Sequence, residues 1–247
     1  MPSEPLRLAV LTGGSTGLGL ALCEALAERG YRVLEFSRSA PHAYSVRLDL
    51  ASPLESQRIA AAAMAAVADL GDVAELLVIH NAGTLDPIGP ASRKDPAAVL
   101  AQLNINFTSC ILVLSAIVAR FQATPCRKVL ANISSGAAHK GYAGWSLYCA
   151  AKAGMEHYVR ALALEQQTEP QPFIPVNIDP GVVDTGMQAF IRSASAADFP
   201  ELARFIRRKD EGGLVPPAQV AAAVCRVLAL PSLVGGARYE AAGGPPG

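Results

Sequence analysis

The chain has 247 residues, of which 51% are apolar, and its 21 lysines and arginines equal its 21 aspartates and glutamates in number. A chain of this length and apolarity can bury one large hydrophobic core. Its balanced charge lacks the strongly basic footprint of a nucleic-acid binder. We therefore expect a single domain over residues 1–247 and no nucleic-acid partner.

The sequence also argues against secretion, a membrane and a metal. Residues 1–5 lack the positive start and long apolar core of a signal peptide. The most apolar stretch, 111–119, falls far short of the roughly twenty residues of a membrane helix. The five cysteines form no Cys-x-x-Cys pair and the four histidines show no metal spacing. These features predict reduced thiols, a cytoplasmic location and no metal.

The first structural pattern is a strand, a glycine turn and a helix in succession. Residues 8–11 form a short apolar run, residues 12–19 read Thr-Gly-Gly-Ser-Thr-Gly-Leu-Gly, and apolar spacing of three and four predicts a helix over 20–29 that stops at Gly30. Glycines in such a turn let the backbone approach a pyrophosphate, which rests on the positive end of the helix. The spacing differs from the usual Gly-x-Gly-x-x-Gly, so an ordinary strand-to-helix turn is the alternative.

The end of the second predicted strand, 31–36, indicates which dinucleotide binds. An NAD site carries an acid about twenty residues past the glycines, where it binds the ribose 2′-hydroxyl. This chain has Ser37 and Arg38 there, and these residue types can hydrogen-bond and neutralise a 2′-phosphate. We therefore predict NADP(H). Two alternatives stay open: Glu35 as a ribose ligand, although its position puts it inside the strand, and Arg38 as a solvated charge.

Further strands are predicted at 44–48, 76–79, 128–133 and 173–178, with helical segments between them. This alternation predicts an α/β fold of the Rossmann type, in which a doubly wound parallel sheet binds ligands at the carboxyl ends of its strands. Four residues follow strand ends and should meet there: Asp49, Asn81, Ser135 and Pro180.

Residues 186–213 interrupt the alternation. This segment carries Met187, Phe190, Phe199 and Phe205 among small and charged residues. It suits a helical lid over a substrate, and plain packing of the aromatic residues fits equally well. The glycine- and proline-rich residues 241–247 are predicted to form a loose tail.

Tyr148 and Lys152 point most directly to chemistry. Residues four apart on a helix are neighbours, so the Lys152 ammonium should favour the phenolate of Tyr148 and lower its pKa from about 10 toward neutrality. Tyr148 would then donate a proton to a carbonyl oxygen, with Ser135 upstream as a second donor. A solvated tyrosine and lysine on one helix face would show the same spacing.

In this order, the motifs resemble those of the short-chain dehydrogenase/reductase family over nearly the whole chain. The resemblance is carried by the glycine motif at 12–19, Asn-Ala-Gly at 81–83, Asn106, Ser135, Tyr148 with Lys152, Pro-Gly at 180–181, and Thr185. Two features depart from the family pattern. His80 stands where the family often has an asparagine. Neither Ser15 nor Thr16 is basic, whereas some NADPH-dependent members carry a basic residue at this place.

The resemblance implies an enzyme that binds NADP(H), and it assigns site residues. The catalytic residues would be Asn106, Ser135, Tyr148 and Lys152, with Lys152 also binding the nicotinamide ribose and Asn106 holding a water that reprotonates it. The cofactor would contact Gly13, Ser15, Thr16, Gly17, Leu18, Gly19, Ser37, Arg38, Asp49, Leu50, Asn81, Ala82, Gly83, Tyr148, Lys152, Pro180, Gly181, Val183 and Thr185. The substrate would contact Ser135, Tyr142, Trp145, Met187, Gln188 and Glu240.

Within the family, residues 144–153 and 179–188 look like those of sepiapterin reductase and the bacterial benzil reductases, which reduce a ketone beside a second carbonyl. Glu240 stands where sepiapterin reductase holds its pterin with an aspartate. The longer glutamate favours a 1,2-diketone over a pterin.

The resemblance thus implies hydride transfer from NADPH to a small-molecule carbonyl substrate. It also implies a homodimer or homotetramer formed through helices at 99–121 and 149–167. An NAD-dependent alcohol dehydrogenase of the same fold and a nonenzymatic dinucleotide sensor are the alternatives.

Overall fold

The computed structural model describes residues 6–68 and 72–241. Its centre is a seven-stranded sheet in the order β3-β2-β1-β4-β5-β6-β7, with every neighbouring pair parallel. The strands are β1 (Leu6–Thr12), β2 (Arg32–Ser37), β3 (Ser45–Arg47), β4 (Val73–His80), β5 (Arg127–Ile133), β6 (Phe173–Asp179) and β7 (Arg238–Glu240). The chain builds one half of the sheet outward from β1 and the other outward from β4, which is the doubly wound topology. The predicted fold class is confirmed, and β7 is a strand that the sequence did not predict.

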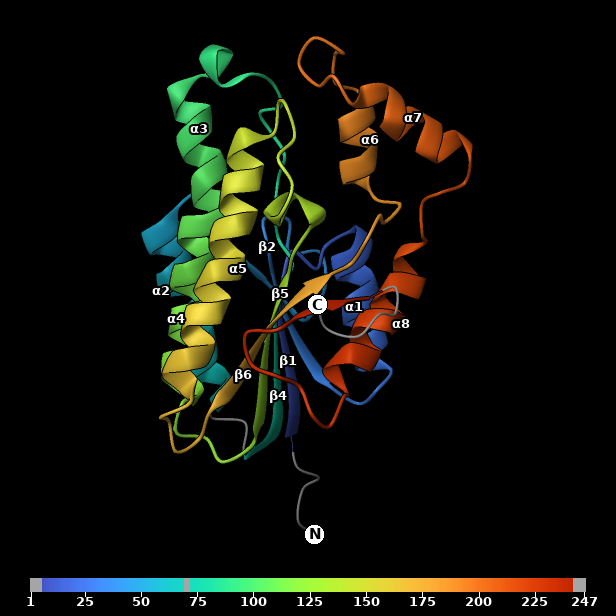
Figure 1. Ribbon diagram of the computed structural model, residues 1–247. Coiled ribbons are helices and arrows are strands. Elements are labelled where there is room, and N and C mark those ends of the chain that lie inside the picture. Colours follow the sequence, from blue (N-terminus) through green and yellow to red (C-terminus); the bar gives the residue numbers. More distant parts are fainter. Residues whose placement is uncertain (1–5, 69–71, 242–247) are drawn as a thin grey trace.

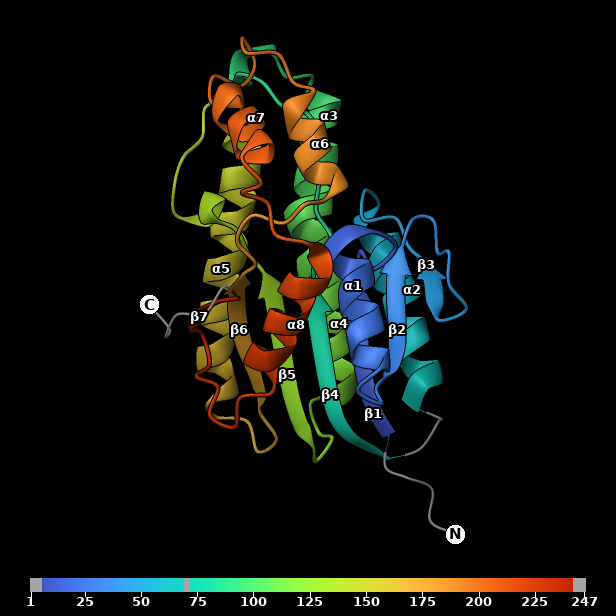
Figure 2. The same ribbon diagram turned by 90° about the vertical axis from the view of Figure 1, so that its right-hand side faces the viewer.

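Helices cover both faces of the sheet (Figure 1). On one face lie α1 (Gly17–Ala27) and α8 (Pro217–Leu228), which pack together; on the other lie α2 (Pro53–Ala68), α4 (Ser109–Phe121) and α5 (Ser146–Gln166). Figure 2 looks onto the face that α1 and α8 cover. The result is a three-layer α/β/α domain.

The central strands supply the core of both layers. In β4, Leu77 and Ile79 belong to the apolar cluster beneath α1 and α8, whereas Leu76 and Val78 belong to the cluster beneath α2, α4 and α5. Successive side chains of a strand point to opposite faces. A strand covered on both faces therefore reads as a continuous apolar run, and this made the strands predictable.

The helical stretch Pro96–Phe121 begins slightly before the helix expected at 99–121 and ends where expected. It comprises α3 (Pro96–Leu103), a π-helical turn at Asn104–Thr108 and α4. By length and composition alone its 26 residues suffice to cross a membrane, although the most apolar stretch, 111–119, is too short to do so by itself. The residues that α4 buries beneath the sheet are Cys110, Val113, Leu114, Ile117 and Phe121. A core helix passes the same length test.

The insertion at 186–213 forms α6 (Gly186–Arg192) and α7 (Leu202–Asp210), a pair set apart from the two layers (Figures 1 and 2). Two of its three aromatic residues pack on Trp145: the Phe199 ring stacks at a centroid distance of 4.6 Å, and Phe205 meets it edge-on at 5.4 Å. The third, Phe190, is 41% exposed. The segment is therefore largely helical, and packing accounts for Phe199 and Phe205 but not for Phe190. Of the predicted tail 241–247, Ala241 is a buried turn residue, and the rest lies outside the described residues.

Candidate active site

A crevice of about 1260 Å³ runs along the carboxyl ends of the strands. Every residue predicted to contact the cofactor lines it. Of the predicted catalytic and substrate residues, Asn106 and Glu240 are absent from its walls, and all the others line it. Residues that the sequence spreads over more than 170 positions thus meet at one edge of the sheet, because parallel strands end together.

The glycine turn is closed tightly around its own backbone. A Cβ at Gly19 would lie 2.0 Å from the carbonyl oxygen of Gly13. The Asn81 amide donates to that same oxygen at 2.9 Å, so the loop after β4 fixes the turn. Thr16 precedes α1 without a side-chain cap. The first N–H groups of α1 are therefore left for an anion such as a pyrophosphate.

Glu35 supports this turn from inside the protein. Its carboxylate is fully buried and accepts the N–H of Gly14 at 2.9 Å and the hydroxyl of Ser37 at 3.1 Å. Ser37 in turn accepts the N–H of Ala40 at 3.1 Å. Glu35 is therefore committed to the turn, and the alternative that it binds a ribose is wrong. Ser37 lines the crevice, but its hydroxyl already donates its proton to Glu35. Arg38 is therefore the better suited of the two predicted residues to bind a phosphate.

A second arginine, which the sequence reasoning missed, stands beside this position. Arg47 pairs in register with Ser37 across β2 and β3, and it lines the crevice together with Arg38. Both arginines are exposed, and neither makes an ion pair with any residue that the structure describes. The only available signal was the place of Arg47 at the end of the third predicted strand.

Tyr148 and Ser135 come together from α5 and the loop after β5. Ser135 lies close enough to the phenol to lower the pKa of Tyr148, but burial outweighs this effect and raises the pKa to about 12. Asp179 and Cys149 raise it further. The prediction that the neighbouring ammonium lowers this pKa toward neutrality is therefore wrong here. Desolvation of a phenolate exceeds the field of a lysine that is itself buried.

Lys152 lies one helical turn beyond Tyr148 and points toward the sheet. Its ammonium donates to the carbonyl oxygen of Ile133 at 2.7 Å and lies 5.7 Å from the centroid of the Tyr148 ring. Burial lowers the pKa of Lys152 to about 8, against the opposing effects of Cys110, Asp179 and Glu156. Its charge is thus sensitive to pH near neutrality.

Asn106 occupies the π-helical turn and serves the backbone. It is buried; its Nδ2 donates to the carbonyl oxygen of Thr84 at 2.8 Å, and its Oδ1 accepts the Thr84 N–H at 2.8 Å. Both ends of the amide are therefore engaged by the loop that follows Asn81-Ala82-Gly83. The side chain holds this wall of the crevice in place from behind, so direct contact with a ligand is not part of its geometry.

His80, the departure from the family pattern, fills a structural position. The Thr12 hydroxyl accepts the N–H groups of Asn81 and Ala82, at 3.2 and 3.3 Å, so its proton goes to His80 Nδ1 at 2.9 Å. Burial, together with the charge of Lys152, lowers the pKa of His80 to about 3. The imidazole is therefore neutral and links β4 to β1.

The substrate end of the crevice is aromatic. Tyr142, Trp145, Met187 and Gln188 line it as predicted, joined by Phe205 from the segment expected to form a lid and by Leu85 and Gln102, which were not predicted. Among the described residues, the buried atoms Trp145 Nε1, Gln188 Oε1 and Gln102 Oε1 have no hydrogen-bond partner. Unpaired buried polar groups are costly. Because the surrounding side chains close these atoms off, a polar substrate could pair with them only after those side chains move.

The position of Glu240 corrects the prediction that this residue contacts the substrate. It is exposed at the end of β7 and lines a separate hollow of about 430 Å³ with His139, Arg160 and Arg238. In the sheet it stands beside Asp179, and Asp179 is the member of that pair that reaches the crevice. The predicted pterin contact of Glu240 is therefore not supported by its position.

The comparisons with known proteins agree with this site. The sequence profile of the short chain dehydrogenase family matches residues 7–196. The chain belongs to the short-chain dehydrogenase/reductase family, and it is accordingly an oxidoreductase of the class that acts on carbonyl and hydroxyl groups.

Individual relatives cover most of the chain. Benzil reductase ((S)-benzoin forming) of Bacillus subtilis (strain 168) is 32% identical over 228 residues, which are 90% of this chain and 93% of that protein. Sepiapterin reductase of Xenopus tropicalis is 31% identical over 235 residues, covering 87% and 88% of the two chains. The crystal structure of the KRED1-Pglu enzyme superposes with a TM-score of 0.79 at 26% identity, covering 94% of this chain and 99% of its own.

Proposed function

We propose that the protein is an NADPH-dependent carbonyl reductase whose substrate is an aromatic ketone with a second carbonyl beside it, a 1,2-diketone. The observation that carries the proposal is the buried, neutral phenol of Tyr148, which lines one crevice together with Ser135 and the aromatic side chains of Tyr142 and Trp145.

The chain's own residues supply the proton side of the reaction. NADPH would supply a hydride to the carbonyl carbon. Tyr148 then donates its phenolic proton to the oxygen, on which negative charge develops, and Ser135 donates a hydrogen bond to the same oxygen. The Lys152 ammonium lies within the same buried region and stabilises the phenolate that remains.

The direction of this chemistry favours reduction. Alcohol oxidation needs a phenolate as base, and with a pKa of about 12 for Tyr148 only a very small fraction is ionised at neutral pH. Reduction needs the protonated phenol, which is the dominant form. The site without ligands thus holds the proton that reduction requires, and the choice between NADPH and NADH depends on the other end of the crevice.

The choice of NADPH is supported by Arg38 and Arg47. Both guanidinium groups line the adenosine end of the crevice, and the one buried carboxylate nearby, on Glu35, is turned toward Gly14. A 2′-phosphate would thus meet two cations, and the Glu35 carboxylate would not compete for them.

The diketone is supported by the shape and the unpaired groups of the substrate end. Tyr142, Trp145 and Phe205 offer aromatic surface, and the unpartnered Nε1 of Trp145 is a donor with no acceptor of its own. A second carbonyl on the substrate would supply that acceptor once the surrounding side chains move to expose the indole N–H. We also propose that the segment containing α6 and α7 forms a lid over the substrate. The contacts of Phe199 and Phe205 with Trp145 join this segment to the substrate end of the crevice.

The test is a substrate panel of benzil, sepiapterin, quinones and simple aldehydes, each with NADPH and NADH. We expect the highest kcat/KM for benzil with NADPH. Oxidation of an alcohol with NAD⁺, without measurable reduction of any panel carbonyl, would refute the proposal. A clear preference of the enzyme for sepiapterin would support the assignment as a reductase but would replace the 1,2-diketone by a pterin as the proposed substrate.

A further inference from the structure

Glu156 is a buried carboxylate that the roles above do not use. Its side chain is 1% exposed and lies on α5, one turn beyond Lys152. It accepts hydrogen bonds from Ser134 Oγ at 2.5 Å, His139 Nε2 at 2.8 Å and Arg160 Nη2 at 2.9 Å. Ser134 directly precedes Ser135. A charge held by so many donors ties the loop after β5 to the helix that carries Tyr148 and Lys152.

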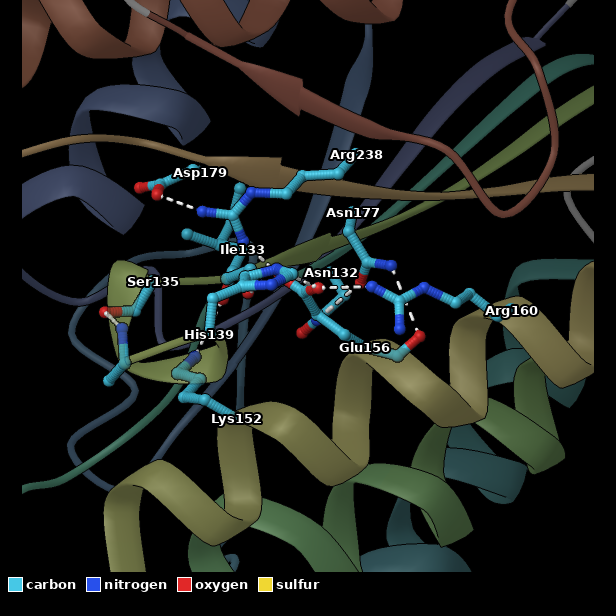
Figure 3. A network of polar contacts seen from close by, with 12 residues as sticks. Asn132, Ile133, Ser135, His139, Lys152, Glu156, Arg160, Asn177, Asp179 and Arg238 are labelled. Carbon is cyan, nitrogen blue, oxygen red and sulfur yellow. Dashed lines mark hydrogen bonds and ion pairs between the residues drawn. The ribbon is translucent and has the colours of Figure 1, made fainter. Parts of the chain in front are cut away.

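Arg238 extends this network to the other wall of the crevice (Figure 3). From β7 its guanidinium donates through Nη1 to Glu156 and through Nη2 to Asp179. Asp179 is the last residue of β6, lines the crevice, and accepts the N–H of Gly181 at 2.9 Å. One guanidinium therefore connects α5 to the start of the Pro180-Gly181 loop.

Titratable groups from several elements surround the catalytic pair. Lys152 is influenced by Asp179 from β6, Glu156 from its own helix and Cys110 from α4, and the neutral imidazole of His80 lies near it on β4. Tyr148 faces Asp179 and Cys149. Among the described residues, Asp179 is thus the carboxylate that acts on both members of the pair, and Arg238 is the cation bound to it.

We propose that Arg238 is a positioning residue that neutralises Asp179 at the crevice wall and, by its second bond to Glu156, holds that neutralised carboxylate against the helix of Tyr148 and Lys152. The inference rests on the proposed reductase function. Its consequence is electrostatic. Without Arg238, an unpaired Asp179 would stabilise the protonated forms of Lys152 and Tyr148.

The pH dependence of reduction tests this directly. In the natural protein, kcat should fall as pH rises through about 8, where Lys152 loses its proton. This fall in kcat is the alkaline limb of the pH profile. Arg238→Gln should move the midpoint of the limb to a pH higher by roughly half to one unit, and Asp179→Asn should move it to a lower pH. The double variant should return toward the natural value, and Arg238→Lys should restore it. Each substitution keeps a side chain of similar shape, so we expect the variants to fold. If one of them does not fold, the pH profiles of the remaining variants still test the proposal.

Arg160→Gln is the matched control. Arg160 also pairs with Glu156, but it makes no bond to Asp179 and is 45% exposed. Its loss should move the pH limb much less than loss of Arg238. A network that only braces the fold would instead lower kcat and the melting temperature in both variants and leave the limb where it was. That result would overturn the proposal.

A measurement without substrate separates this proposal from the proposed function. The chain has five lysines, so NMR of protein carrying ¹³C at lysine Cε can follow the titration of Lys152, with the signal assigned by its loss in Lys152→Ala. We expect the titration midpoint to rise in Arg238→Gln and fall in Asp179→Asn, even if no panel carbonyl is reduced. Equal midpoints in all variants would refute the role of Arg238, whatever the substrate proves to be.

Discussion

The carboxylate of Glu35 accepts the backbone N–H of Gly14 at 2.9 Å, with no part of its side chain exposed. Glu35, which the sequence left open as an alternative ribose ligand, instead supports the glycine turn from inside the protein. If that turn holds the pyrophosphate, it meets the part of the cofactor that NADPH and NADH share.

Glu35→Ala should accordingly weaken both cofactors by the same factor. It leaves the N–H of Gly14 and the hydroxyl of Ser37 without an acceptor, at a cost of about 1 to 3 kcal/mol for each group left unsatisfied. Fluorescence titration with each cofactor measures the effect, and Glu24→Ala, on the exposed side of α1, is the control. Loss of NADH affinity alone would mean that Glu35 binds the ribose after all.

Arg38→Ala and Arg47→Ala should each raise the Kd for NADPH by roughly one to two orders of magnitude, the worth of one charged hydrogen bond, and scarcely change that for NADH. Both arginines line the crevice beside Ser37, where the proposed function puts the adenosine. Arg32→Ala, at the exposed start of β2, provides the control. An Arg47 variant with unchanged NADPH affinity would leave Arg38 as the only phosphate ligand.

Tyr148→Phe should lower kcat by roughly 10² to 10⁴, the usual worth of a general acid, while NADPH binds as before. The change removes one hydroxyl from a buried site and little else. Tyr158→Phe on the same helix removes a hydroxyl that meets Ser115 outside the crevice, and it should keep full activity. Turnover above a tenth of the natural rate in the Tyr148 variant would contradict the assignment.

His80 should make the fold sensitive to acid. The unfolded chain takes up a proton at this residue below pH 6.5, whereas the folded protein resists protonation down to about pH 3. The unfolded state therefore binds more protons in this window, and stability falls as the pH is lowered, by about 2 kcal/mol from this residue at pH 5.

His80→Asn should remove that part of the slope. Urea unfolding at pH 7 and pH 5, followed by circular dichroism, compares the variant with the natural protein. His157→Asn, on the exposed side of α5, should change nothing. An unchanged slope in the His80 variant would show that the acid sensitivity arises elsewhere.

Gly19→Ala should abolish cofactor binding, because its Cβ would lie 2.0 Å from the Gly13 carbonyl oxygen and 2.6 Å from Asn81 Nδ2. Gly186→Ala is matched to it: Gly186 also lines the crevice, but its Cβ would meet nothing within 4 Å. Equal NADPH binding by the two variants, measured by fluorescence, would show that the turn can open.

Much of the fold followed from local patterns in the sequence. Apolar runs predicted six of the seven strands, and their alternation with helices predicted the parallel, doubly wound sheet. The seventh, Arg238–Glu240, has only three residues and no apolar run. The meeting of the motifs was equally predictable, since a motif tied to a strand end moves with that end: residues 13, 15–19, 81–83 and 180–181 all line the crevice.

By itself the sequence determined which elements form and which motifs end at one edge of the sheet, because those features depend on local periodicity and spacing. Only the tertiary structure decided how side chains from distant strands meet. It set Arg47 beside Ser37, joined Arg238 to Glu156 and Asp179, and left Glu240 outside the crevice. It also decided the charge state of Tyr148. A helical spacing of four residues predicts the neighbouring ammonium, but desolvation depends on everything packed around the phenol, and here burial prevails.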